Sequence, residues 1–282
     1  MVCHGRCLYN AGRIFTVLAT GVPVGRAYDS IKKEGSDANF PSAMCRHRRG
    51  LFAAITVGLG YGKGQQTPAW MDNKQRTPMV DRLLANLDIT HLANFASFPG
   101  LTSSDLVAFS LWVPRLHSYY VKNNAQLKIH LPHLQQLFPN SVFSTATFNF
   151  GPRVWTFKHR DVCNLPFGWC AVQSLGDFDM AKGSHLVLWD LQVVVKFPAG
   201  TLILFPSATI SHSNVPVEGG EEHISFTQFT AGGMFQWVEN GGRTAAELAQ
   251  EDPDQWEHIQ ALKERRPLGA HRTDLGSATL KS

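Results

Sequence analysis

Residues 142–150 read Val-Phe-Ser-Thr-Ala-Thr-Phe-Asn-Phe, and this stretch decides the fold of the 282-residue chain. Its side chains alternate between two faces, as they do along a β-strand. One face carries Phe143, Thr145, Thr147 and Asn149, and the other carries Ala146, Phe148 and Phe150. Further strand-like runs follow at 169–175, 185–197, 201–205 and 223–230, separated by Gly and Pro. Several short strands in close succession predict a β-sandwich or barrel.

Helical patterns lie on both sides of this β region. A start signal at Thr77-Pro78 precedes apolar residues at helical spacing, which are Val80, Leu83, Leu84 and Leu87. A second stripe, with a kink expected at Pro114, comprises Leu106, Phe109, Trp112, Val113 and Leu116. After Gly241-Gly242, capping-box patterns at Thr244 and Asp252 predict two more helices. We therefore expect a β core flanked by N- and C-terminal helices.

The composition restricts the class of protein. With 44% hydrophobic and 17% charged residues, the chain is too apolar to be disordered and too polar for a membrane protein. The apolar run 14–24 is too short to span a bilayer, and a buried strand is expected there. The five cysteines form no CxxC pair, so neither a disulfide framework nor a zinc ribbon is indicated. We expect a reduced, intracellular protein.

Four segments are expected along the chain. A poorly ordered N-terminal segment covers 1–45, and 46–141 holds a strand (51–57), a Gly-rich loop (58–64) and helices that pack on the core. The core covers 142–240, and 241–282 forms the C-terminal helices and tail. The Gly-rich loop lacks the Lys-Ser/Thr ending of a phosphate-binding loop, so no nucleotide site is predicted there.

Positive charge gathers near the N-terminus. Residues 1–50 carry 8 basic and 3 acidic side chains, whereas residues 143–240 carry 5 and 8. The basic cluster, defined as Arg46, Arg48 and Arg49, is the sharpest positive spot. Such a cluster permits a polyanionic partner, and the alternative is a solvated loop with no ligand.

The residues that indicate chemistry begin at His159-Arg160-Asp161. Positions i and i+2 of a strand point to the same side, so His159 and Asp161 are able to converge on one ion. His212 follows the predicted strand 201–205. Two histidines and one carboxylate form the facial triad of non-haem Fe(II) oxygenases, which leaves positions open for a co-substrate and O₂. The alternative is that both histidines are ordinary core or surface residues.

A polar stripe on the last predicted strand adds to this hypothesis. Alternation places four side chains on one face: His223, Ser225, Thr227 and Phe229. Polar groups inside a small barrel need a partner, and a bound dicarboxylate such as 2-oxoglutarate is one. The alternative is that this face is the solvent side of an edge strand.

These motifs resemble the TET/JBP family of Fe(II)/2-oxoglutarate-dependent nucleic-acid dioxygenases. The resemblance rests on the stretch His159-Arg160-Asp161-Val162-Cys163-Asn164, on His212 and on His223-x-Ser225. The sequences of 149–169, 183–190 and 225–233 resemble more closely the fungal, transposon-associated branch of this family. The resemblance implies an α+β fold with a double-stranded β-helix (jelly-roll) core, and oxidation of 5-methylcytosine in DNA to 5-hydroxymethylcytosine and further products.

The resemblance also implies roles for individual residues. His159, Asp161 and His212 would bind iron, and Ser225 would contact 2-oxoglutarate. Asn164 would contact the flipped cytosine and Phe229 would stack on it, as bases do on aromatic rings. Two features depart from the family. His223 stands where the family has an arginine that anchors 2-oxoglutarate, and the cysteine-rich zinc module of the animal enzymes is absent.

The expected function is therefore that of a nuclear, monomeric dioxygenase that uses Fe(II), 2-oxoglutarate and O₂ and binds DNA containing methylated bases. The basic cluster Arg46, Arg48 and Arg49 would contact phosphates, and no membrane is involved. Three alternatives stay open. One is a dioxygenase acting on another methylated base, such as N6-methyladenine, or on a protein. The others are a catalytically degenerate DNA-binding module derived from a mobile element, favoured by His223, and a metal protein that needs no 2-oxoglutarate.

Overall fold

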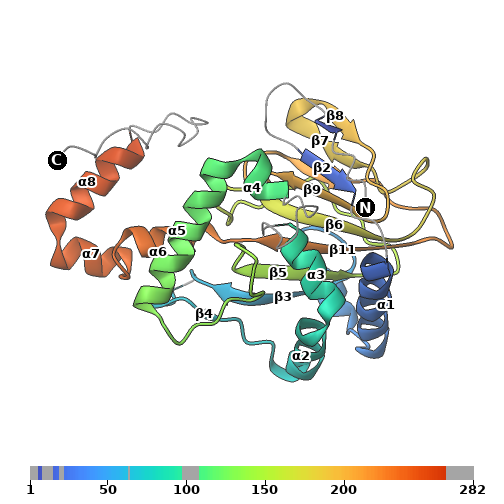
Figure 1. Ribbon diagram of the computed structural model, residues 1–282, viewed down its shortest axis with the longest axis horizontal. Coiled ribbons are helices and arrows are strands. Elements are labelled where there is room, and N and C mark those ends of the chain that lie inside the picture. Colours follow the sequence, from blue (N-terminus) through green and yellow to red (C-terminus); the bar gives the residue numbers. More distant parts are fainter. Residues whose placement is uncertain (1–5, 8–14, 19–21, 63, 97–107, 265–282) are drawn as a thin grey trace.

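The computed structural model describes residues 6–7, 15–18, 22–62, 64–96 and 108–264, and it contains two antiparallel sheets (Figure 1). The larger sheet has eight strands in the order β1-β2-β9-β6-β11-β5-β3-β4. Its strands are β1 Arg6–Cys7, β2 Phe15–Leu18, β3 Ala53–Gly60, β4 Ala69–Trp70, β5 Thr145–Phe150, β6 Cys170–Asp177, β9 Thr201–Phe205 and β11 Glu222–Phe229. The smaller sheet, in the order β10-β7-β8, consists of β7 Leu186–Leu188, β8 Val193–Val195 and β10 His212–Asn214. Two antiparallel sheets with surrounding helices make an α+β fold that is consistent with a jelly-roll core.

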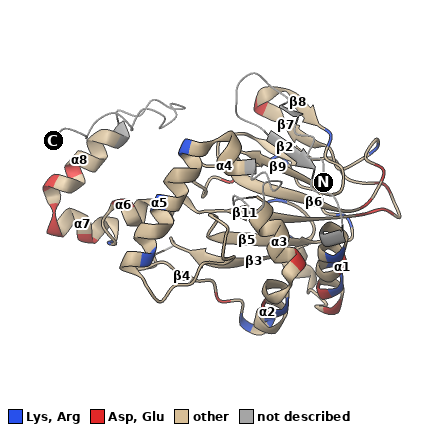
Figure 2. Cartoon of the chain, viewed as in Figure 1, with Lys and Arg blue, Asp and Glu red and all other residues tan. Residues whose placement is uncertain are grey.

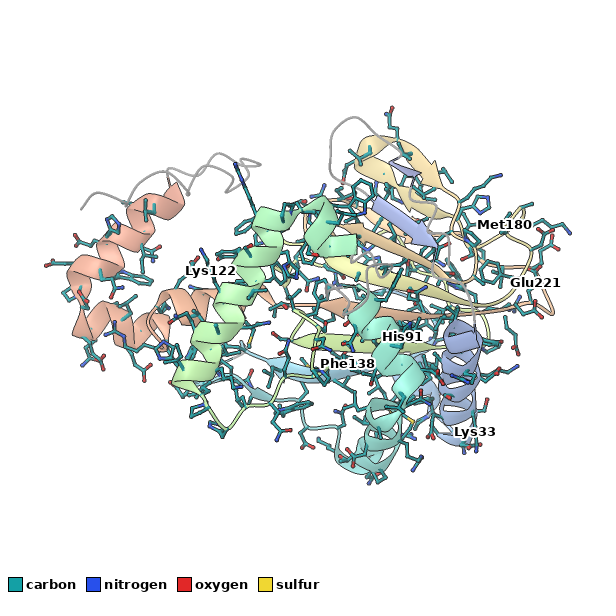
Figure 3. All side chains as sticks on the ribbon, in the orientation of Figure 1. Lys33, His91, Lys122, Phe138, Met180 and Glu221 are labelled. Carbon is teal, nitrogen blue, oxygen red and sulfur yellow. The ribbon has the colours of Figure 1, made fainter. Side chains whose placement is uncertain are left out.

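The predicted alternation of 142–150 separates two cores. Phe148 and Phe150 of β5, together with Phe226 of β11, pack on the helical side of the large sheet. The helices that cover this side are α1 Val22–Asp37, α2 Thr77–Ala85 and α3 Leu87–Phe95 (Figure 1). Phe138, from the loop before β5, reaches the same core and lies 6.0 Å from the Phe226 ring (Figure 3). The opposite side of the sheet is left for the interior between the two sheets.

Apolar side chains from both sheets fill one part of that interior. Ile203 and Phe205 of β9 pack with Leu186 and Leu188 of β7. Burying such side chains stabilises the fold by roughly 1.5–3 kcal/mol each. Because the small sheet packs on the large one here, the loops that connect the two sheets are held at a fixed distance from β11.

The remaining helices lie at and beyond one end of the large sheet (Figure 1). They are α4 Ala108–Trp112, α5 Pro114–His130, α6 Gly232–Glu239, α7 Ala245–Glu251 and α8 Pro253–Glu264. Phe109 stacks on Phe143 at 5.6 Å between ring centroids and so joins α4 to the start of β5. Figure 1 shows α7 and α8 extending away from the sheets, and Figure 2 shows that both helices carry acidic residues. None of the described helices is both long and apolar enough to cross a bilayer.

The first predicted helix is two helices. α2 begins at Thr77, but Arg76 rather than Thr77 is its N-cap, and no side chain caps it. Asn86 then ends α2 and caps α3, because its side-chain oxygen accepts the N–H groups of Asp88 and Ile89, each at 3.0 Å. Leu87 is therefore the first residue of a new helix and is 83% exposed, so its predicted place in the apolar stripe is wrong.

The second predicted helix is also divided. The expected kink at Pro114 is a complete break, since Val113 leaves helical geometry between α4 and α5. The predicted positions 103–106 lie outside the described residues. The capping box of Thr244 and Glu247 is confirmed at the start of α7.

The strand predictions hold, with three differences of boundary. β3 continues through Gly58 and Gly60, so the segment 58–64 is a loop only from Tyr61 onward. The run 185–197 is a hairpin, β7 and β8, joined by a 3-10 turn at Trp189–Leu191. Within 1–45, β2 joins the large sheet, whereas Val22–Asp37 forms α1, a helix that the sequence did not predict. Cys45, Cys163 and Cys170 are free thiols.

Candidate metal centre

A two-residue bridge between separate parts of the chain brings the predicted ligands together. The backbone N–H of His159 donates to the carbonyl of His212 at 3.0 Å, and His212 donates back to His159 at 2.9 Å. His212 begins β10, whereas His159 and Asp161 lie in a loop, so the expectation that alternation along a strand aligns them is wrong. Asp161 is fixed separately, because its N–H donates to the carbonyl of Ser207 at 2.9 Å.

The three side chains meet at one point. His159 Nε2 lies 3.7 Å from Asp161 Oδ1, and His212 Nε2 lies 3.9 Å from Asp161 Oδ2. One ligand atom from each residue lies within 4.8 Å of the others, and this is the one such group among the described residues. Two imidazoles and a carboxylate at this separation fit a single Fe(II) ion on one face of its coordination sphere.

Backbone carbonyls select the histidine tautomer that binds metal. His159 Nδ1 donates to the carbonyl of Phe157 at 2.7 Å, and His212 Nδ1 donates to that of Ile210 at 2.9 Å. Each Nε2 is therefore left with a lone pair directed at Asp161. Burial lowers the pKa of both histidines, so both are neutral at pH 7, which is the form that a metal requires.

Asp190, for which no role was predicted, joins the two segments that carry the triad. Its carboxylate accepts the N–H of Ser211 at 2.5 Å and the guanidinium of Arg160 at 3.1 Å and 3.2 Å. Ser211 precedes His212, and Arg160 lies between His159 and Asp161. These contacts lower the pKa of Asp190, first through Ser211 and then through Arg160. Two features of the sequence could have suggested this role: Arg160 lies between two predicted ligands and needs an acidic partner, and Asp190 is an aspartate in the 183–190 motif with no assigned function.

The basic cluster borders this site. Arg49 is partly buried, and although burial lowers its pKa, nearby Asp161 raises it. The Arg48 guanidinium donates to the carbonyl of Arg160 at 3.1 Å, and Arg46 is exposed. The Arg49 carbonyl accepts the Phe157 N–H at 2.8 Å. Arg48 and Arg49 thus contact the segments around the triad, and a phosphate contact by the basic cluster stays a prediction beside the solvated-loop alternative.

The polar stripe of β11 faces the interior between the sheets. β11 lies between β5 and β6, so the edge-strand alternative is wrong. His223 is 2% exposed, and its Nδ1 donates to the Val154 carbonyl at 2.6 Å, while its buried Nε2 has no partner. Burial lowers the pKa of His223 to about 4. Ser225 Oγ accepts from Asn149 Nδ2 at 3.0 Å, and Asn149 Oδ1 has no partner.

Unpaired buried polar atoms are costly, by about 1–3 kcal/mol each. Ser225 lies opposite Asn149 on β5 and Ser174 on β6, so His223 and Ser225 belong to a patch that several strands build. With the Nδ1 proton given to Val154, both unpaired atoms, His223 Nε2 and Asn149 Oδ1, are hydrogen-bond acceptors. A ligand that donates hydrogen bonds would pair with them directly, whereas a carboxylate would pair with His223 Nε2 only after this atom takes up a proton.

Asn164, one of the two residues expected to receive a base, lies near the triad. Asn164 Nδ2 donates to Ser207 Oγ at 3.2 Å, and the carbonyl of the same serine holds Asp161. Phe229 ends β11 and is only partly buried, against the core between the sheets. Asn164 also forms a bridge with Ala231, two residues beyond Phe229. The structure therefore brings Asn164 close to the triad and to the end of β11.

The fold resembles that of solved oxygenases. The structure of NgTET1 in complex with 5mC DNA matches with a TM-score of 0.56 at 13% identity, over 79% of this chain and 73% of that chain. A 2OG-Fe(II) oxygenase family oxidoreductase from Burkholderia pseudomallei gives a TM-score of 0.39 at 15% identity, covering 76% of this chain and 84% of that one. A Pseudomonas putida prolyl-4-hydroxylase gives 0.35 at 16% identity, covering 77% and 92%. The sequence matches no protein-family model and no curated protein.

The likeness to NgTET1 establishes the fold. Within that fold, the His-Asp-His triad is a group that could hold a metal ion, and its donor set fits Fe(II) with coordination positions left open.

Replacing any one triad residue should remove the metal. The variants His159→Ala, Asp161→Ala and His212→Ala each leave two protein ligands, which do not hold Fe(II) facially. We expect anaerobic Fe(II) or Co(II) titrations to show no specific binding. His185→Ala is the matched control, because His185 Nδ1 also bonds a carbonyl two residues earlier but the side chain is not in the triad. Undiminished binding by any triad variant would remove that residue from the ligand set.

Asp190→Ala should weaken metal binding without removing a ligand. Partners that orient ligands typically contribute about 10–100-fold in metal affinity, so we expect a loss of that size in Co(II) titrations. Asp179→Ala is the control, since Asp179 also accepts a backbone N–H and lies beside a cation, Lys182, away from the triad. Equal metal affinities for the two variants would show that Asp190 does not position the ligands.

Proposed function

We propose that the protein is an Fe(II)/2-oxoglutarate-dependent dioxygenase that oxidises 5-methylcytosine in DNA to 5-hydroxymethylcytosine and further products. The observation that carries this proposal is the His159-Asp161-His212 triad, in which His212 is buried and both Nε2 atoms face Asp161. A structural neighbour solved with 5mC DNA supports the choice of substrate. The fungal, transposon-associated branch, a nuclear location and a monomeric state belong to the same proposal, on the resemblance of the sequence motifs.

The triad residues His159, Asp161 and His212 would hold the iron. Bound Fe(II) with 2-oxoglutarate and O₂ supplies the oxidising power that replaces a methyl hydrogen by hydroxyl, with release of succinate and CO₂. The chain itself positions the reactants and excludes water. Ser225 and His223 would bind the distal carboxylate of 2-oxoglutarate, and the Arg49 guanidinium adds positive charge beside Asp161.

His223 imposes a proton requirement on co-substrate binding. Its Nδ1 proton is committed to the Val154 carbonyl, so neutral His223 presents a lone pair, not a proton, at Nε2. A lone pair repels a carboxylate. The carboxylate is therefore bound only when His223 takes up a second proton, and burial, which lowers its pKa to about 4, opposes that uptake at pH 7.

The substrate base would enter beside the iron. A methyl group inside a duplex is out of reach, so the nucleotide must leave the stack. Asn164 would contact the cytosine edge, Phe229 would stack on the ring, and Arg46, Arg48 and Arg49 would contact phosphates. These assignments suit the exposed or partly buried positions of the residues around the triad.

A second function has a specific observation in its favour. Because neutral His223 is a poor carboxylate anchor, the chain is also a candidate for a degenerate, non-catalytic module that binds DNA. Such a module would bind methylated DNA but would release no succinate.

Product analysis tests the proposed activity. Duplex and single-stranded DNA containing 5-methylcytosine, incubated with the protein, Fe(II), 2-oxoglutarate and ascorbate, should yield 5-hydroxymethylcytosine by nucleoside mass spectrometry. Asp161→Ala should yield none. Oxidation of N6-methyladenine alone would correct the substrate. DNA retention with neither product nor succinate would instead establish the degenerate module.

The affinity for 2-oxoglutarate should depend on pH with a definite sign. The free pKa of His223 is about 4 and a bound carboxylate raises it, so affinity falls as pH rises between these two values, by up to about tenfold per unit. His223→Arg carries a permanent charge and should bind about tenfold more tightly at pH 7, with a flat profile. The measurement is an anaerobic titration of the Fe(II)-loaded protein with 2-oxoglutarate, followed by the charge-transfer absorption band of the complex, from about pH 5.5 to 8.

The arginine variant also serves as the control for titration of the iron ligands, which would affect both proteins equally. His185→Arg controls for added charge alone. A flat profile for the unmodified protein, with no gain in the arginine variant, would show that His223 is not the anchor.

A further inference from the structure

An exposed tryptophan stands beside the triad, outside every role assigned so far. Trp189 opens the 3-10 turn after β7 and is 45% exposed. Its backbone N–H donates to the Ser211 carbonyl at 2.9 Å, and its ring Nε1 donates to Ser213 Oγ at 3.0 Å. Ser211 and Ser213 flank His212 on either side. The ring is therefore fixed to the strand that carries an iron ligand.

A cation lies over the same ring. Lys158 Nζ is 4.8 Å from the centroid of the Trp189 ring, a cation–π distance. Lys158 directly precedes His159, so the ring contacts the neighbours of both triad histidines. Phe157, the residue before Lys158, is also exposed, at 40%. Large aromatic side chains left in water so close to a reaction centre are candidates for ligand contact.

Positive side chains lie at and near this ring. Lys158 lies over it, and the exposed Arg48 reaches the carbonyl of Arg160, whose guanidinium contacts Asp190, the residue after Trp189. The nearest carboxylate along the chain, Asp190, is already engaged by Arg160 and Ser211. Fixed aromatic rings with cations beside them are the combination that binds unpaired nucleotides, whose bases stack and whose phosphates need positive charge.

We propose that Trp189 is a stacking platform for the base next to the oxidised nucleotide, with Lys158 and Arg48 on the adjoining phosphates. This surface, the Trp189 platform, rests on the proposed function and adds to it the form of the substrate. A base that stacks on Trp189 is not paired in a duplex. The preferred partner is therefore a DNA strand that is single or opened at more than the target nucleotide.

Fluorescence anisotropy tests this proposal. The probe is a labelled single strand of about 12 nucleotides that contains one 5-methylcytosine, a length within the range of known single-strand sites. Trp189→Leu keeps apolar bulk but removes stacking and should weaken binding about tenfold, which is about 1.4 kcal/mol. Trp189→Phe should retain most of the affinity. Trp70→Leu is the matched control, since Trp70 is similarly exposed, at 39%, but lies on β4 at the far edge of the large sheet.

The contribution of the cations should appear in the salt dependence of DNA binding. Lys158→Ala should lower the slope of log affinity against log salt by about 0.7, the value for one lost contact to a single strand. The unmodified protein should prefer the single strand to the same sequence as a duplex. Co(II) binding measured on Trp189→Leu checks that β10 and His212 stay in place.

Failure of this proposal is distinguishable from failure of the proposed function. If 5-hydroxymethylcytosine is formed but Trp189→Leu binds the strand as tightly as the unmodified protein, the platform is wrong and the dioxygenase stands. A strand affinity equal to that of the duplex would also overturn it. A change in oligomeric state of Trp189→Leu in light scattering, with unchanged DNA affinity, would overturn it in favour of a contact between protein molecules.

Discussion

Two backbone hydrogen bonds between His159 and His212 hold the candidate metal centre together, and the other features of the site depend on them. The bridge joins the loop between β5 and β6 of the large sheet to β10 of the small sheet. It therefore requires the two sheets to be packed together. Within it, the carbonyls of Phe157 and Ile210 take the Nδ1 protons and turn both Nε2 atoms toward Asp161. Metal ligation is thereby built into the backbone, because tautomer and ring orientation are fixed before any ion binds.

The interior of the sandwich carries a second constraint. β11 places His223 and Ser225 where a β-sandwich normally buries apolar groups, and His223 Nε2 and Asn149 Oδ1 remain without partners there. Such atoms destabilise the folded chain unless a ligand pairs with them. These unpaired atoms between two apolar cores are the feature on which the proposed 2-oxoglutarate site rests. Burial lowers the pKa of His223 and keeps it neutral, so under the proposed function co-substrate binding and proton uptake would be linked.

Periodicity in the sequence was sufficient for the longer strands and for the two faces of β5 and β11, because alternation is local, but it did not predict β4 or β10. The triad members were also recognisable, by residue type and spacing, but the reason for their convergence was not, since it lies in a bridge between distant segments. Long-range pairing likewise hid Asp190, Trp189 and the approach of Arg49 to Asp161. The prediction of a helix end was wrong where a single side chain determines it. Asn86 caps a new helix, and Leu87 is therefore exposed to solvent.

An anaerobic crystal structure with Fe(II) and 2-oxoglutarate tests the central claim most directly. The account predicts iron bound by Nε2 of His159, Nε2 of His212 and a carboxylate oxygen of Asp161, with the distal carboxylate of 2-oxoglutarate within hydrogen-bonding distance of His223 Nε2 and Ser225 Oγ. Iron bound through other side chains, or a co-substrate whose distal carboxylate lies away from His223 and Ser225, would contradict it.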